Sequence, residues 1–427
     1  MKYGLIGEKL GHSFSKQIQE RIAELKGIDD YQYELCELNE DEFRTFMEKK
    51  EFKGINVTIP YKKAVIPYLD HIDESAKAIG AVNTIVNRDG KLYGYNTDFG
   101  GFLYMLNIHH VDLNNKKVLI IGNGGASAAV QAVCKHEHVG KMIMVSRSAN
   151  NGAISYDEMY SSHLDSEIII NTSPVGMYPN IGNSPVDISW FHKAECVIDV
   201  IYNPILTRLC FEAQEANIKR VIGLEMLIAQ AKYAFEIFLD TSFDDSIIDE
   251  LKKEILKQRC NIVLIGMPSA GKTTIGMKLQ DKLGKEFIDL DDLIIQKAGM
   301  SIPEIFKESG ESGFRAIETE VAIEASKMNN KIIATGGGAI KHKVNMDFLR
   351  LNGITIFIDR DIDKLISEDP TRPLSSSKQA LQQMHKERHP LYQKYAAYVA
   401  DNNSNIEETV EDIVQAYNNI LVDAVAD

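Results

Sequence analysis

The sequence is poor in cysteine and in basic charge, and each shortage excludes a class of protein. Its five cysteines are scattered and form no CxxC pair, which argues against a zinc site and favours thiols in a reducing compartment. Lysine and arginine total 47 against 61 aspartates and glutamates, so the net charge is −14. Nucleic acids and anionic membranes are therefore not expected as partners. A small anionic substrate would need a local cluster of basic side chains.

Long hydrophobic runs and repeats are also missing. No apolar run approaches the ~20 residues that a membrane-spanning helix needs, and the start MKYGLIGEKLGHS lacks a signal-peptide core. No repeat of about 20–50 residues is present either. We expect a cytoplasmic protein with small-molecule substrates, and the sequence does not indicate its oligomeric state.

What the sequence has is a regular alternation over 427 residues. Short apolar segments rich in β-branched residues alternate with amphipathic helical ones, which predicts α/β domains with mostly parallel sheets. The expected buried strands are, in chain order, KYGLIG, GINVTI, KVLIIG, KMIMVS, SEIIIN, ECVIDV, NIVLIG, KIIATG and ITIFID.

A glycine-rich turn lies between the expected strand and helix of KVLIIGNGGASAAVQAV, residues 117–133. Gly122, Gly124 and Gly125 would let the backbone approach a pyrophosphate, and the helix N-terminus would supply N–H groups. The third glycine of the GxGxxG pattern is replaced by Ser127, so an ordinary strand-to-helix turn is the alternative.

The end of the next strand bears on the cofactor. A site for NAD would place an acidic residue there, about 20 residues after the glycines. This sequence instead has Ser146, Arg147 and Ser148, which favours the 2′-phosphate of NADP. A solvated arginine at a strand end is the alternative.

Polar side chains in the first hundred residues could hold a substrate. Ser13 and Ser15 could donate to a carboxylate, although serines before a helix are usually N-caps. Lys62 follows a turn fixed by proline, and most lysines are merely solvated. Asn83 and Asp98 end strands, where turns also favour such residues.

Together these motifs resemble shikimate dehydrogenase over about residues 1–240. SxS, NVTxPxK, AVNT, NTD, GxGGA, NTSPxGM, DxxYxPxxT and GxxMLxxQ occur in one order. The resemblance implies NADPH-dependent reduction of 3-dehydroshikimate to shikimate, with Lys62 and Asp98 as the catalytic pair. A reduced ketone needs a proton and charge stabilisation, and a cationic lysine supplies both.

The same resemblance implies two sets of binding residues. The substrate would contact Ser13, Ser15, Thr58, Asn83, Tyr202 and Gln230. The NADP site would comprise Gly122, Asn123, Gly124, Gly125, Ala126, Ser146, Arg147, Ser148 and Gly223.

A phosphate-binding loop appears late in the chain. GMPSAGKT, residues 266–273, fits GxxxxGK[ST] between an expected strand and helix. Lys272 would reach the β- and γ-phosphates of ATP, and Thr273 would bind magnesium. A loop without nucleotide is the alternative.

Later motifs point to the phosphate acceptor. FIDLDD, GESGFRAIE, ATGGGAI, TRPL and ERHPLY follow in an order that resembles shikimate kinase over residues 261–427. Each alone could be a solvated strand end, a surface arginine or a turn. The resemblance implies an ATP site at Gly266, Ser269, Ala270, Gly271, Lys272, Thr273, Thr274 and Arg372. It implies that Thr273 and Asp289 support magnesium and that shikimate is held by Asp291, Arg315, Gly337 and Arg388, with Asp291 and Lys272 catalytic.

The expected architecture combines these parts. An α/β substrate domain over 1–105 is followed by a Rossmann NADP-binding domain over 106–223, and a helix at 224–240 returns to the first domain. A connector over 241–259 leads to a P-loop kinase domain with a parallel sheet over 260–427. Two alternatives remain: a preference for quinate or NAD, and a degenerate half acting as scaffold or sensor. A degenerate half should have lost Lys62, Asp98, Lys272 or Asp291, and all four are present.

Overall fold

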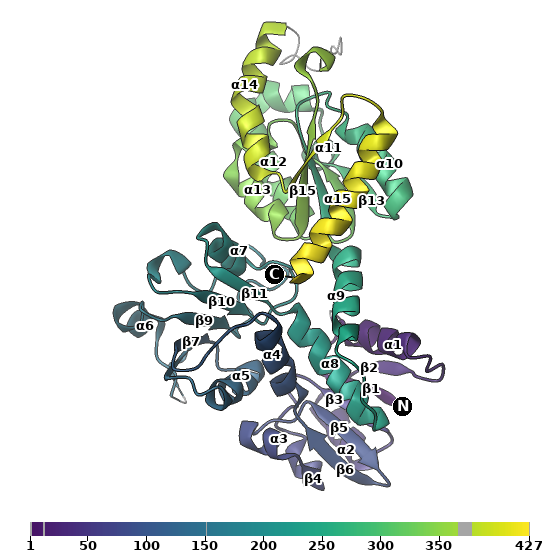
Figure 1. Cartoon of the computed structure of the whole chain (residues 1–427), viewed down its shortest axis with the longest axis vertical. Coiled ribbons are helices and arrows are strands. Elements are labelled where there is room, and N and C mark those ends of the chain that lie inside the picture. Colours follow the sequence, from purple (N-terminus) through teal and green to yellow (C-terminus); the bar gives the residue numbers. More distant parts are fainter. Residues whose placement is uncertain (1, 12, 151, 366–377, 427) are drawn as a thin grey trace. The chain divides into compact units, whose positions relative to one another are not determined.

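The fold is built around three β-sheets. The computed structural model describes residues 2–11, 13–150, 152–365 and 378–426. The chain divides into two compact units, Met1–Asn203 with Thr207–Lys252 and Pro204–Leu206 with Lys253–Asp427. Two sheets belong to the first unit and one to the second (Figure 1). The predicted α/β class is confirmed. Among the described helices, none is both long and apolar enough to cross a membrane.

The first sheet is mixed, although strand pairing in the described residues is mostly parallel, as expected. Its order is β2-β1-β3-β5-β6-β4, and β5 runs antiparallel to both neighbours. Asp89 and Gly90 join β5 to β6 with positive φ at both residues, as a two-residue hairpin requires. The strands are β1 (Tyr3–Gly7), β2 (Tyr33–Glu37), β3 (Gly54–Val57), β4 (His71–Ile72), β5 (Thr84–Arg88) and β6 (Lys91–Tyr95).

Helices bury both faces of this sheet. Phe43 and Ala76, from two helices on one face, share a hydrophobic core with Ile6 and Ile55. On the other face Phe238 stacks on Tyr3, with ring centroids 5.5 Å apart. The helices are α2 (Glu40–Lys49), η1 (Ile66–Tyr68) and α3 (Glu74–Ile79) on the first face, and α1 (Ser15–Leu25) and α8 (Leu224–Leu239) on the second.

The second sheet is parallel and doubly wound, in the order β11-β10-β9-β7-β8. The direction of winding reverses between β7 and β9, and in such sheets ligands bind at the carboxyl ends of the strands at this point. The strands are β7 (Lys117–Ile121), β8 (Lys141–Val145), β9 (Ile168–Asn171), β10 (Cys196–Asp199) and β11 (Lys219–Ile222). The helices of this region are α4 (Thr97–Ile108), α5 (Gly125–His136), α6 (Tyr156–Ser162), η2 (Ile188–Trp190) and α7 (Arg208–Glu215).

The third sheet, in the second unit, is also parallel, with the order β13-β14-β12-β15-β16. Figure 1 shows α10 and α15 on one side of it and α12, α13 and α14 on the other. The strands are β12 (Asn261–Ile265), β13 (Glu286–Asp289), β14 (Lys331–Ala334), β15 (Gly353–Asp359) and β16 (Tyr398–Asp401). The helices are α10 (Lys272–Leu283), α11 (Leu290–Ala298), α12 (Ile302–Ser326), η3 (Ala339–Lys341), α13 (Lys343–Arg350), η4 (Ile362–Lys364), α14 (Lys378–Tyr395) and α15 (Ile406–Ala426).

The segment expected to connect the units is largely helical. Helix α9 (Ser246–Arg259) spans most of it, and the division between the two compact units falls inside this helix. Its Lys252 is buried and forms an ion pair with Glu225 of α8, which also contacts His109 Nε2 at 3.0 Å. Burial alone would raise the pKa of Glu225, but the hydrogen bond from His109 and the charge of Lys252 hold it below its usual value.

Candidate active sites

Three of the predicted residues meet at one point in the first unit. Lys62 Nζ donates to Asp98 Oδ2 at 2.6 Å, and Asn83 Nδ2 donates to Asp98 Oδ1 at 2.9 Å. Both charged side chains are mostly buried, with 16% of Lys62 and 11% of Asp98 exposed. Each oxygen of the carboxylate therefore has its own donor, which fixes the position of the Lys62 ammonium.

The local fold explains why these side chains converge. Asp98 lies in the first turn of α4, where its backbone N–H donates to the N-cap Asn96. The backbone of Lys62 accepts from Val82 N–H at 2.8 Å, which ties the turn after β3 to the segment before Asn83. Backbone contacts at the carboxyl end of β3 therefore set the position of the ion pair.

The structure adds Thr97, which the sequence did not indicate. Its backbone N–H donates to Asn83 Oδ1 at 2.8 Å, and its hydroxyl accepts from Asn83 Nδ2 at 3.1 Å. Asn83 is thereby held in the orientation that presents its amide group to Asp98. The signal in the sequence was only the NTD tripeptide, in which Thr97 has no evident chemical role.

The predicted serines lie at the same end of the first sheet, where the carboxyl ends of β1 and β3 meet. They follow β1, whose carboxyl end is paired in parallel with β3, the strand that leads into Thr58. Ser13 Oγ accepts from the N–H of Ser15 at 3.2 Å, but the N-cap of α1 is Phe14 and no side chain caps this helix, so neither serine is its N-cap. The ring of Phe14, between the serines, packs on the predicted substrate residue Tyr202 with centroids 5.1 Å apart.

Gln230 reaches this region from α8. A Cβ built on Gly101 of α4 would lie 3.0 Å from Gln230 Cβ, so only glycine allows α8 to pack this closely one turn beyond Asp98. The Gln230 amide donates to Leu227 O within its own helix. Gln230 therefore lies on a helix that packs against α4, one turn from Asp98 of the predicted catalytic pair.

The glycine-rich turn lies at the reversal point of the second sheet. Gly122 has φ of +107°, and a Cβ there would approach Thr172 Oγ1, after β9, to 2.8 Å. Gly124 is open on the side where a Cβ would be, and Gly125 would come within 3.6 Å of Lys62 Cδ. Helix α5 begins without a side-chain cap or an acidic residue in its first turn, so its N-terminus suits a phosphate. Ala126 is the second residue of that helix.

The residues after β8 fit a second phosphate. Arg147 and Ser148 are exposed beside the glycine turn, and Asn123 Nδ2 contacts the Asn150 carbonyl at 3.4 Å. Ser146 Oγ is buried without a hydrogen-bond partner among the described residues. A guanidinium with a nearby hydroxyl suits a 2′-phosphate. Gly223, further along, is the N-cap of α8 and packs against Val200.

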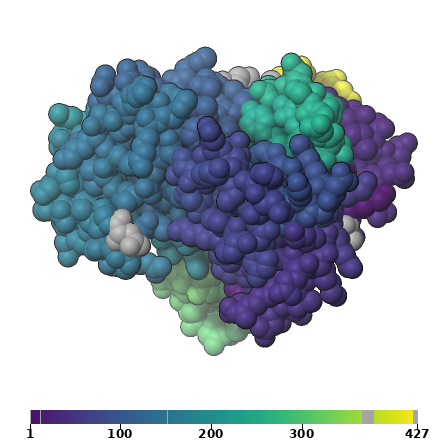
Figure 2. Space-filling model, turned by 90° about the horizontal axis from the view of Figure 1, so that it is seen from below, coloured from purple at the N-terminus to yellow at the C-terminus, as the bar shows by residue number. Residues whose placement is uncertain are grey.

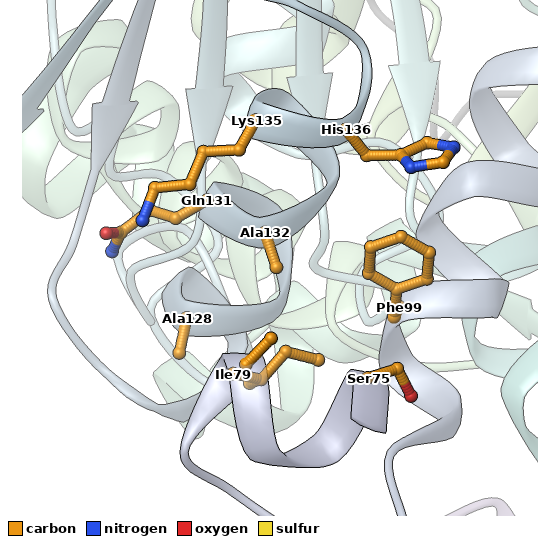
Figure 3. A pocket seen from close by; sticks show the side chains of 9 residues that line it. Ser75, Ile79, Phe99, Ala128, Gln131, Ala132, Lys135 and His136 are labelled. Atoms are coloured by element: carbon orange, nitrogen blue, oxygen red, sulfur yellow. The ribbon is translucent and has the colours of Figure 1, made fainter. Parts of the chain in front are cut away.

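A separate hollow of about 530 Å³ lies between α3 and α5 (Figure 3). Figure 3 shows Phe99 and His136 on one side and Gln131 and Lys135 on another, over Ile79, Ala128 and Ala132. None of the predicted catalytic or binding residues lines it. Phe99 follows Asp98, but the hollow itself is not the site described above.

The phosphate-binding loop has its expected form in the second unit. Gly266 has φ of +153° with Ile358 O 2.7 Å from a built Cβ, and Gly271 has φ of +99° at the N-cap of α10. Lys272 Nζ bridges the carbonyls of Gly266 and Met267 at 2.9 Å, so it lies across the loop. The loop thus combines a cationic side chain with an uncapped helix N-terminus. Ser269, Ala270, Thr273 and Thr274 occupy the other predicted positions.

Oxygen ligands suited to magnesium converge beside this loop. Thr273 Oγ1 lies 3.2 Å from Asp289 Oδ2, and Asp289 Oδ1 accepts from the N–H of Asp291. A hydroxyl and a carboxylate are the hard oxygen ligands that Mg²⁺ prefers. Asp291 faces Gly336, whose built Cβ would be 2.8 Å from Asp291 Oδ1. The predicted acceptor-binding carboxylate therefore faces the glycine turn after β14.

The glycine turn also gathers the predicted arginines. Arg388 Nη1 donates to Gly337 O at 2.9 Å, and a Cβ on Gly338 would approach Arg315 Nη1 to 2.6 Å. Arg315 pairs with Glu318 at 2.8 Å, and burial raises the pKa of Glu318 although Arg315 opposes the shift. The Nε atoms of Arg315 and Arg388 are buried without hydrogen-bond partners among the described residues. These arginines fit a site for an anionic acceptor.

Other residues support this site without a signal in the sequence. Tyr392 donates to Gly337 O at 2.6 Å, and Asn402 Nδ2 donates to Ala270 O at 2.7 Å, which holds the phosphate loop. Both come from elements that lie far from the loop in the sequence. The predicted ATP contact Arg372 lies outside the described residues.

Comparisons with known proteins support the predicted resemblances of both the N-terminal and the C-terminal part of the chain. A family model for the shikimate dehydrogenase substrate-binding domain matches residues 5–85, and a shikimate kinase model matches 268–418. A shikimate dehydrogenase (NADP(+)) of Clostridium beijerinckii is 38% identical over 259 residues, which cover 58% of this chain and 96% of the relative.

Solved structures show the same relationship. Shikimate dehydrogenase 1 of Peptoclostridium difficile is 39% identical with a TM-score of 0.55, covering 60% of this chain and 98% of that one. A chorismate mutase/shikimate 5-dehydrogenase fusion from Clostridium acetobutylicum is 40% identical with a TM-score of 0.55, covering 58% and 94%. Both predicted resemblances are confirmed. The chain belongs to the shikimate dehydrogenase family and carries a shikimate kinase domain behind it, which makes it a bifunctional enzyme of shikimate metabolism.

Proposed function

We propose that this chain reduces 3-dehydroshikimate to shikimate with NADPH and then phosphorylates shikimate with ATP. The observation that carries the first step is the Lys62–Asp98 pair, held by Asn83 at the edge of the first sheet. A Cβ built on Gly125, at the start of the proposed cofactor helix, would lie 3.6 Å from Lys62 Cδ, so the two residues are close neighbours. Cofactor and catalytic pair therefore share one site.

The residues have distinct roles in the reduction. When bound, NADPH supplies the hydride. The Lys62 ammonium binds the substrate carbonyl oxygen and donates a proton from Nζ as that oxygen becomes a hydroxyl. Asp98 orients Nζ, and Ser13 and Ser15 bind the substrate carboxylate. Thr58, Asn83, Tyr202 and Gln230 contact the ring hydroxyls or orient the ring.

In the kinase, positioning and charge neutralisation do most of the work. Lys272 and the N–H groups of the phosphate loop bind the ATP phosphates. Thr273 and Asp289 would hold magnesium, which neutralises phosphate charge when bound. Asp291 accepts the proton of the attacking hydroxyl, and Arg315 and Arg388 hold the shikimate carboxylate. This local cluster explains how a protein with a net charge of −14 binds anions.

Replacing Arg147 with alanine should lower kcat/KM for NADPH about 10–100-fold and leave kcat/KM for NADH nearly unchanged. The reason is the loss of a charged hydrogen bond to the 2′-phosphate, worth roughly 1.5–3 kcal/mol. Initial rates with both cofactors check this. Lys141→Ala, which removes an exposed charge at the other end of β8, is the control. An equal loss with NADH would remove Arg147 from cofactor selection.

Asn83→Ala should lower the dehydrogenase kcat about 10-fold or more without changing the KM for NADPH. Without the amide, Asp98 Oδ1 loses its donor, and an unsatisfied buried group costs roughly 1–3 kcal/mol. Steady-state kinetics with thermal unfolding of the variant test this. A large rise in the NADPH KM with unchanged kcat would instead indicate a general loosening of the cleft.

We also propose that the enzyme works in the cytoplasm on small-molecule substrates. None of its five cysteines, all among the described residues, forms a disulfide, and four of them are buried. A reducing compartment that contains NADPH and ATP suits both proposed reactions.

Separate assays of the purified chain test the proposed function. NADPH oxidation would be followed with 3-dehydroshikimate, the reverse reaction with shikimate or quinate and NADP⁺, and ADP release with shikimate and ATP. We expect turnover with shikimate in both assays and a much lower rate with quinate. Faster oxidation of quinate would replace the proposed dehydrogenase substrate, and ADP release that is independent of shikimate would remove the proposed kinase acceptor.

A further inference from the structure

Three side chains beside the kinase site have no role in the proposed mechanism. Asp359 ends β15, and His385 and His389 lie four residues apart on α14, which places them on one face of the helix. One potential ligand atom from each residue lies within 4.8 Å of the other two. All three side chains are half-buried, so the group is partly accessible to solvent.

The two imidazoles are arranged to share a ligand. Their ring centroids are 4.6 Å apart, and the His389 ring packs edge-to-face with Phe357, with centroids 5.3 Å apart. His389 Nε2 lies 3.3 Å from Asp359 Oδ2. Burial, followed by the neighbouring charge of His389, lowers the pKa of His385.

We propose that Asp359, His385 and His389 bind one divalent transition-metal ion of the zinc class. Two imidazoles and a carboxylate suit zinc, whereas magnesium prefers oxygen ligands alone. Tetrahedral zinc bonds of about 2.0–2.2 Å place ligand atoms about 3.3–3.6 Å apart. His389 Nε2 and Asp359 Oδ2 already have this separation, and the ligand atoms of the whole group lie within 4.8 Å of one another. Three protein ligands leave the fourth position to water.

This zinc site shares no residue with the proposed magnesium site but lies next to the reacting groups. The carbonyl of Asp359 accepts from Asn402 N–H, and the Asn402 side chain holds the phosphate loop at Ala270. His389 follows Arg388, which is bound to Gly337 O. An ion here would link the end of β15 to the helix that carries the acceptor-binding arginine.

Calorimetric titration of the full chain with zinc chloride, after treatment with chelator and without ATP or magnesium, tests the site. We expect one zinc equivalent to bind at this site in the unaltered chain. His385→Gln should weaken that binding by about 100-fold or more, because even partners of metal ligands contribute 10–100-fold. His342→Gln is the matched control, since it removes an exposed histidine of the same unit outside the group and should change nothing.

A second measurement separates loss of the site from loss of the fold. The metal-free His385→Gln variant should phosphorylate shikimate near the normal rate; if it does not, Asp359→Asn replaces it in the titration. Cobalt substitution should give the visible spectrum of a tetrahedral nitrogen and oxygen site. The proposal would be overturned if His385→Gln bound zinc as tightly as the unaltered chain, or if the unaltered chain bound no zinc. A thiolate charge-transfer band in the cobalt spectrum would also overturn it.

Discussion

Lys62→Ala should lower the dehydrogenase kcat by about 10²–10⁴, the usual contribution of a positioned proton donor. The ammonium is the only group in the Lys62–Asn83–Asp98 cluster that carries a positive charge toward the developing alkoxide. In the alanine variant Asp98 keeps only the hydrogen bond from the Asn83 amide, and this amide cannot donate the proton that Lys62 supplies. Single-turnover reduction of 3-dehydroshikimate at saturating NADPH measures the loss at the chemical step.

Two controls make this result specific. Lys63→Ala removes the adjacent, exposed lysine and should leave kcat unchanged. The kinase activity of the Lys62 variant should also be normal, because Lys62 lies in the other compact unit. If the variant retains an unchanged dehydrogenase kcat, Lys62 has no catalytic role.

Lys272→Ala should produce the converse defect, a loss of about 10²–10³ in kinase kcat with normal dehydrogenase activity. Removing one preorganised donor to transition-state charge typically costs this much. Lys272 is held across the phosphate loop by the carbonyls of Gly266 and Met267, so its position is set before nucleotide binds. Coupled measurement of ADP release with shikimate as acceptor checks the loss.

Lys282→Ala is the matched control for this variant. It removes an exposed lysine of the same helix, paired with Glu411 at the surface, and should leave both activities unchanged. A collapse of the dehydrogenase in the Lys272 variant would contradict the view that each unit carries its own reaction.

Much of the fold could be predicted from the sequence because central parallel strands are buried on both faces and therefore apolar throughout. All nine expected segments contain strands, with ends that differ by one or two residues. The edge strands β2 and β16 gave no such signal, unlike the edge strand β8. In β2 only Tyr33 is buried, and the short β16 buries only Ala400, so their compositions resemble those of loops.

The same distinction applies to the two sites. Residues within a motif, such as Lys272 and Asp98, were recognisable because local sequence fixes the local backbone. Thr97, Tyr392 and Asn402 support the sites through tertiary contacts, which the sequence does not reveal. The proposed zinc site was missed for the same reason, since Asp359 lies far from His385 and His389 along the chain.

The central claim is that one chain carries out two consecutive reactions. A single incubation with 3-dehydroshikimate, NADPH, ATP and magnesium, followed by NADPH absorbance and mass spectrometry, tests it most directly. The account predicts loss of NADPH together with formation of shikimate 3-phosphate. Loss of NADPH with shikimate accumulating unphosphorylated would contradict it, because the second unit would then be inactive or act on another acceptor.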